Sequence, residues 1–128
     1  MTQPPFNTLA WFEVATTDIE ATERFYGALF DWTFAVPPDL AAAGLDYRVT
    51  TSPATGEPMG GVVAPADGET GHAVFYIMVA DVDATAAGAE RLGGTVVAQE
   101  SSPVAGPAFA MLRDPDGHLF GVFTPPAM

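Results

Sequence analysis

The chain contains one sequence pattern twice. Residues 12–22 read FEVATTDIEAT and residues 75–85 read FYIMVADVDAT, each running from apolar residues into Asp, an apolar residue, an acid, Ala and Thr. The halves also end alike, with residues 59–62 (MGGV) matching residues 120–123 (FGVF). Two copies are too few for a solenoid, so they predict two similar modules packed as a pseudo-twofold pair. A ligand site built from both copies is then expected.

Composition excludes several classes of function. The chain has 128 residues, is 48% hydrophobic and contains no cysteine, which predicts a single globular domain without disulfides or thiolate metal sites. Its 16 acidic residues face only four arginines, for a net charge of −12. Such a surface repels phosphate groups, so we expect no nucleic-acid partner and no membrane association. The N-terminal residues lack the basic and apolar regions of a signal peptide, which favours a cytoplasmic protein.

Hydrophobic periodicity and turn residues predict the same order of elements, βαβββ, in both modules. The modules span about residues 8–65 and 72–125 of a single domain of residues 1–128. The predicted strands cover residues 9–15, 32–36, 45–51, 58–64, 72–79, 95–100, 108–113 and 119–124. Thr17 or Asp18 caps the first helix, and Asp81 caps the second. The inward helix faces are predicted to contain Ile19, Thr22, Tyr26 and Leu29, and Val82, Ala86, Ala89 and Leu92.

Several of these segments resemble a known family. Residues 18–32 (DIEATERFYGALFDW), 81–84 (DVDA), 92–94 (LGG) and 114–118 (DPDGH) are similar to the two helices and the terminal hairpin of the vicinal oxygen chelate superfamily. That superfamily includes glyoxalase I, bleomycin-resistance proteins and extradiol dioxygenases. The resemblance covers about residues 8–124 and implies an α+β fold, in which paired βαβββ modules form a cup-shaped mixed sheet with two main helices and a central cavity.

The resemblance also implies where a metal would bind. In the metal-dependent members, His and Glu side chains on the first and last strands of each module hold one divalent cation. Here the first-strand positions are occupied by Trp11 and Val74, and the last-strand positions fall within residues 59–61 and 120–122. None of these side chains is a metal ligand. We therefore expect neither a metal ion nor any other cofactor.

Strand alternation selects a different set of site residues. Trp11 and Glu13 share the face that the family uses for ligands, and Tyr76 is the repeat counterpart of Glu13. These two polar residues are the candidate catalytic pair; alternatively, Glu13 is a rim residue or pairs with Arg48 or Arg113. The expected ligand-binding residues are Trp11, Glu13, Tyr47, Met59, Val74, Tyr76, Met78, Met111 and Phe120. His72 and His118 are expected to have structural positions.

The function expected from these features is metal-free binding of a small apolar or aromatic organic molecule. Such a protein sequesters its ligand, as in antibiotic resistance, or carries out acid–base chemistry without a cofactor; the sequence leaves open whether it is an enzyme. The alternatives are a divalent-metal lyase or dioxygenase, and an accessory or regulatory module without a ligand. A twofold homodimer is expected because paired modules leave sheet edges that need cover.

Overall fold

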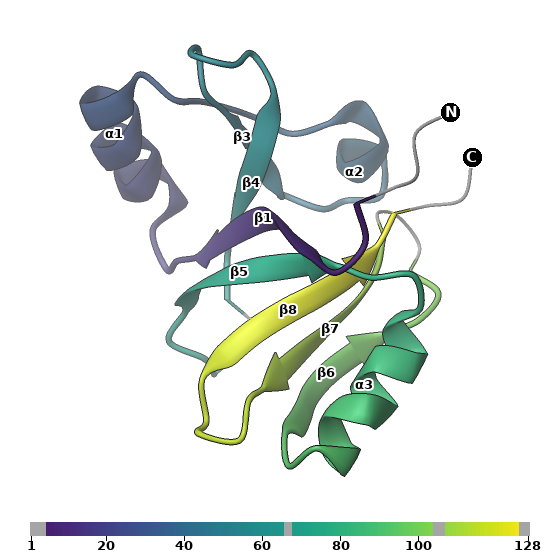
Figure 1. Ribbon diagram of the computed structural model, residues 1–128. Coiled ribbons are helices and arrows are strands. Elements are labelled where there is room, and N and C mark those ends of the chain that lie inside the picture. Colours follow the sequence, from purple (N-terminus) through teal and green to yellow (C-terminus); the bar gives the residue numbers. More distant parts are fainter. Residues whose placement is uncertain (1–4, 66–67, 104–106, 126–128) are drawn as a thin grey trace. The chain divides into compact units, whose positions relative to one another are not determined.

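The computed structural model describes residues 5–65, 68–103 and 107–125 (Figure 1). It divides into two compact units. One, here termed the first-repeat unit, is Trp11–Ala73; the other, the second-repeat unit, consists of Met1–Ala10 and Val74–Met128. The division follows the sequence repeat closely.

The first-repeat unit has the predicted βαβββ order. Its elements are β1 (Thr8–Ala15, whose first residues belong to the other unit), α1 (Ile19–Phe30), β2 (Thr33–Ala35), the short α2 (Pro38–Ala42), β3 (Arg48–Thr51) and β4 (Pro58–Val63). The strands lie in the order β2-β3-β4-β1. β1 and β4 are parallel, and the other neighbours are antiparallel. β3 begins three residues later than the predicted strand start at residue 45.

The second-repeat unit has the same topology. Its elements are β5 (His72–Met78, which begins in the other unit), α3 (Val82–Arg91), β6 (Thr95–Glu100), β7 (Ala108–Arg113) and β8 (Leu119–Thr124). The strands lie in the order β5-β8-β7-β6, again with one parallel pair, β5 and β8. Two βαβββ modules of a mixed α+β class are thus confirmed.

An aspartate begins each main helix, as predicted. Asp18 Oδ1 accepts a hydrogen bond from the backbone N–H of Ala21 at 2.9 Å, and Asp81 Oδ1 accepts one from Ala84 at 3.0 Å. Each bond satisfies a backbone donor that has no partner within the helix, and each carboxylate lies near the positive end of the helix dipole. The repeated motif therefore encodes the same strand-to-helix turn twice.

The core of the second-repeat unit lies between α3 and strands β6–β8 (Figure 1). Val82 and Ala86 of α3 pack there with buried strand residues, which are Val79, Ala110, Leu112 and Val122. Leu92, predicted to face inward, is 81% exposed. That prediction was wrong because the helix ends at Arg91, and Gly93, with φ 95°, redirects the chain beyond it.

Aromatic rings connect α1 with its sheet. Tyr26 stacks on Trp32 with ring centroids 5.4 Å apart, and Trp32 lies 5.7 Å from Phe12 of β1. Leu29, also predicted to face inward, is 58% exposed. The rings of Tyr26 and Trp32 make the contact between α1 and the sheet, and Leu29 stays outside it. Among the described residues, no helix is long and apolar enough to cross a membrane.

The cap of α3 gives a direct test of this turn. Replacing Asp81 with Ala should lower the free energy of unfolding by about 1 kcal/mol, because the N–H of Ala84 loses its acceptor. Asp81→Asn should retain most of the stability, since Asn caps helices nearly as well. Urea denaturation of the three proteins measures the difference. Equal losses for Ala and Asn would show that the carboxylate stabilises the protein in another way.

Candidate functional site

Trp11 and Glu13 lie on one face of β1, and Phe12 lies on the other. The Phe12 ring contacts Trp32 on the α1 side, and a Cβ on Gly60 of β4 would lie only 2.2 Å from that ring. On the opposite face, Trp11 Nε1 donates a hydrogen bond to the hydroxyl of Tyr47 at 2.9 Å. Strand alternation from Trp11 therefore predicted the correct face for Glu13.

Tyr47, which immediately precedes β3, and Arg48, its first residue, lie in different environments. Arg48 forms ion pairs with Glu23 of α1 at 2.8 Å and with Asp46 at 3.0 Å. Tyr47 instead joins Trp11, and the charge of Glu13 acts on its phenol. Tyr47, one of the expected ligand-binding residues, therefore lies on the same face as Glu13.

Glu13 forms a hydrogen bond with His72 that was not expected from the sequence. Its Oε2 lies 2.9 Å from Nε2 of His72, and the Glu13 and His72 side chains are 11% and 18% exposed. The expected alternatives, Arg48 and Arg113, are engaged elsewhere, since Arg113 donates to the carbonyl of Gly117. The alternation that selected Val74 and Tyr76 on β5 also selects His72 two residues earlier, so a signal was present. Trp11, Glu13, Tyr47 and His72 are called the Glu13 cluster below.

Tyr47 is held in its neutral form. Burial raises the pKa of its phenol well above the usual value, and the negative charge of Glu13 raises the pKa further. The hydrogen bond from Trp11 acts in the opposite direction, whereas a hydrogen bond to Glu13 again favours the protonated phenol. The phenol therefore remains a hydrogen-bond donor at physiological pH, and the cluster forms a chain of donors that ends on one carboxylate.

Tyrosine rings fill the last-strand positions at which the family places metal ligands. Gly61 of β4 is in register with Glu13, and a Cβ there would lie 2.1 Å from the Tyr47 ring. Gly121 of β8 is in register with Tyr76, and a Cβ there would lie 2.4 Å from the Tyr76 ring. Neither position has room for a His or Glu side chain while its tyrosine stays in place.

The residues present therefore do not fit a metal ion of the family type. Trp11 and Val74 occupy the first-strand positions, and glycines under tyrosine rings occupy the last-strand positions. Across residues 5–65, 68–103 and 107–125, no group of three or more His, Cys, Asp or Glu side chains could hold a metal ion.

Most of the remaining candidates lie on the same face of their strand as Tyr76 or Gly61. In the second-repeat unit, buried Tyr76 donates a hydrogen bond to the sulfur of Met111 at 3.0 Å. Val74 and Met78 each lie two residues from Tyr76 along β5, so they share its face of the strand, and both are half-buried. In the first-repeat unit, Met59 precedes Gly61 by two residues on β4 and is also half-buried.

Phe120 does not join Tyr76. It stacks against Phe75 at 5.9 Å and packs against the core under α3, on the other face of its strand from Gly121. The sequence had aligned Phe120 with Met59, whereas the two register pairs align Gly121 with Gly61. A register shift of one residue moves every side chain to the opposite face, which explains the error. Phe120 therefore lies on the helix side of its sheet and not on the side of Tyr76.

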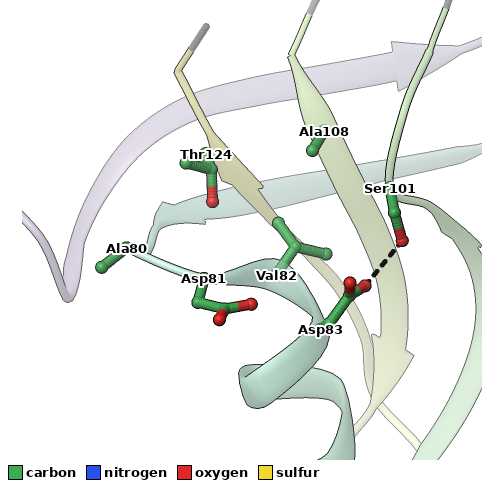
Figure 2. Close-up of a pocket in the computed structure, with 7 residues that line it drawn as sticks. All are labelled: Ala80, Asp81, Val82, Asp83, Ser101, Ala108 and Thr124. Atoms are coloured by element: carbon green, nitrogen blue, oxygen red, sulfur yellow. Dashed lines mark hydrogen bonds between the residues drawn. The ribbon is translucent and has the colours of Figure 1, made fainter. Parts of the chain in front are cut away.

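A shallow hollow of about 180 Å³ lies at the N-terminus of α3 (Figure 2). Its acidic groups already have structural roles, because Asp81 caps the helix and Asp83 accepts a hydrogen bond from Ser101 at 2.6 Å. Hydrogen bonds from Ser101 and Gln99 lower the pKa of Asp83, so its carboxylate is stabilised where it stands. The hollow therefore belongs to the cap of the helix.

Comparison with known proteins identifies a family for this chain and several relatives. The family model for the glyoxalase-like domain matches residues 11–123. CFP32 of Mycobacterium tuberculosis (strain CDC 1551 / Oshkosh), which carries the name of a glyoxylase, is 36% identical over 118 residues, covering 92% of this chain and 44% of that protein. The anthracycline biosynthesis protein DauV of Streptomyces sp. (strain C5) is 27% identical over 125 residues, covering 89% of this chain and 46% of that protein. The chain thus spans less than half the length of these curated relatives.

A solved structure supports the fold. Methylmalonyl-CoA epimerase from Mycobacterium tuberculosis superposes with a TM-score of 0.64 at 14% identity, covering 98% of this chain and 94% of that chain. At this identity the likeness concerns the fold alone. Together with the family match, it confirms the resemblance to the vicinal oxygen chelate superfamily that the sequence motifs indicated.

The steric account of Gly121 predicts a clear effect. Gly121→Ala should lower the free energy of unfolding by about 1–3 kcal/mol, because its Cβ would overlap the buried Tyr76 ring. Gly88→Ala, within α3, is the matched control and should raise stability by about 0.5–1 kcal/mol, since only the flexible Arg91 side chain is near. Thermal or urea unfolding measures both. A neutral Gly121→Ala would mean that the position has room for a ligand side chain.

Proposed function

The chain belongs to the glyoxalase-like domain family, and we propose that it binds a small aromatic molecule at the Glu13 cluster without a metal ion. The observation that carries the proposal is a largely buried carboxylate, Glu13, held beside two aromatic side chains, Trp11 and Tyr47. Small-molecule sites commonly combine apolar and aromatic surface with a few positioned polar groups.

The aromatic preference follows from the lining of this face. Trp11 and Tyr47 are half-buried, so their rings retain exposed surface on which a flat ligand can stack. Met59, on the neighbouring β4, adds a polarizable side chain that adapts to ligand shape. One relative is named for anthracycline biosynthesis, and anthracyclines are polycyclic aromatic compounds. This name fits the proposed ligand class without fixing the compound.

The metal-free part of the proposal depends on steric fit. A family-type metal needs ligands at positions that here contain Trp11, Val74, Gly61 and Gly121, and tyrosine rings cover both glycines. The Glu13–His72 pair provides a carboxylate and an imidazole at 2.9 Å, a combination suited to moving a proton. Binding is thus the primary function proposed, and any reaction at this site would be acid–base chemistry by these two residues.

Two further expectations stay predictions. Tyr76 has the register position in the second-repeat unit that Glu13 has in the first, so it remains the second candidate for a polar contact with the ligand. The twofold homodimer expected from the sequence likewise stays a prediction.

A neutral aromatic probe tests the proposal. 1-Naphthalenemethanol should shift the indole N–H resonance of Trp11 in NMR spectra and leave that of Trp32 unchanged, because Trp32 packs under α1 on the opposite face. Glu13→Gln should weaken binding roughly five- to a hundredfold by removing a charged acceptor. Tyr76→Phe tests the second candidate in the same titration.

Glu20→Gln makes the same chemical change at an exposed position of α1 and should leave binding unchanged. Melting temperatures of the variants confirm that each is folded. Binding that is indifferent to Glu13→Gln, or that shifts Trp32 as strongly as Trp11, would contradict the proposed site.

A further inference from the structure

The donors of the Glu13 cluster are already directed at acceptors within it. Trp11 Nε1 donates to the Tyr47 hydroxyl at 2.9 Å, and the Tyr47 phenol is hydrogen-bonded to Glu13. His72 Nε2 lies 2.9 Å from Glu13 Oε2. An anionic ligand would have to break one of these bonds to gain the indole, the phenol or the Nε2 donor. A ligand that carries its own O–H or N–H group would instead find a carboxylate acceptor.

The charge of the chain also disfavours anionic ligands. The net charge is −12, and the basic residues are four arginines. Arg48, adjacent to Tyr47, is held by Glu23 and Asp46 on the other side of its strand, and Arg113 donates to the carbonyl of Gly117. A carboxylate or phosphate ligand would therefore approach a negatively charged protein and meet Glu13 at the site.

We infer that the Glu13 cluster selects its ligand by charge: it accepts neutral or cationic aromatic molecules that carry an O–H or N–H donor, and it rejects carboxylates and phosphates. This inference rests on the proposed function and narrows its ligand class. The donor of the ligand bonds to the Glu13 carboxylate, and its ring lies against Trp11 and Tyr47. Anionic acyl thioesters of coenzyme A, such as the substrate in the name of the structurally similar epimerase, fall outside this class.

Four naphthalenes with different one-carbon groups at position 1 separate the effects of the ligand's charge, its hydrogen-bond donor and its aromatic ring. They are 1-naphthylmethylamine, a cation at neutral pH; 1-naphthalenemethanol, a neutral donor; 1-methylnaphthalene, neutral without a donor; and 1-naphthoate, an anion. Each is titrated into the unmodified protein, and its affinity is measured from the Trp11 indole resonance. The amine and the alcohol should bind at least about tenfold more tightly than naphthoate, because charge-assisted hydrogen bonds to Glu13 favour them. The affinity of 1-methylnaphthalene should lie between that of naphthoate and those of the amine and the alcohol.

Glu13→Gln should remove the discrimination. At high salt, which screens the net charge of the rest of the chain, the advantage of the amine over naphthoate in Glu13→Gln should shrink to within about threefold, since the carboxylate at the site is gone. Raising the salt concentration should narrow the gap in the unmodified protein only partly, because the Glu13 side chain is largely buried.

The outcomes distinguish the two proposals. Naphthoate binding as tightly as the alcohol would overturn charge selection while leaving aromatic binding intact. Tight binding of all four probes with equal affinity would do the same. If none of the four moves the Trp11 resonance, the proposed function itself fails, and the charge selection fails with it.

Discussion

In each module a tyrosine ring packs directly against a strand glycine, and this packing leaves no room for a side chain at that strand position. Gly61 lies under Tyr47 in the first-repeat unit, and Gly121 lies under Tyr76 in the second. Even a methyl group at either position would overlap the ring unless the tyrosine moved. At the last-strand positions where the resemblance to metal-dependent members of the superfamily implies metal ligands, this chain has glycines covered by tyrosine rings. The absence of ligand residues is part of how these sheets are built.

The Glu13 cluster follows from that arrangement. Because Gly61 has no side chain, Tyr47 reaches over it to Trp11 and to the carboxylate of Glu13. A carboxylate this far removed from water needs partners, and His72 provides one at 2.9 Å. The result is a hydrogen-bonded set of two aromatic side chains, an acid and an imidazole on one face of the sheet. Such a set is suited to holding a flat molecule that brings its own donor.

Much of this arrangement could be predicted from the sequence, since it depends on local patterns. The repeated Asp caps, the βαβββ order of elements along the chain and the shared face of Trp11 and Glu13 all follow from periodicity, turn residues and alternation. Alternation along β5 places His72 on the same face as Val74 and Tyr76, but it does not show which side chain on another strand His72 contacts, so its bond to Glu13 was missed. Phe120 was misplaced by a register shift of one residue between the halves. Leu29 and Leu92 have the spacing of inward-facing helix residues, but both are exposed. At α1 the rings of Tyr26 and Trp32 make the contact with the sheet, and α3 ends at Arg91, before Leu92.

Metal binding is the property that most directly separates this account from that of a conventional metal-dependent relative. Purified protein is analysed for bound metal, and then Zn²⁺, Ni²⁺, Mn²⁺ and Fe²⁺ are each titrated in while the Trp11 indole resonance and the melting temperature are followed. We predict far less than one metal ion per chain, no change in melting temperature on adding a chelator, and no saturable shift at Trp11. Tight binding of one ion per chain that displaces the Tyr47 ring from Gly61 or the Tyr76 ring from Gly121 would contradict it.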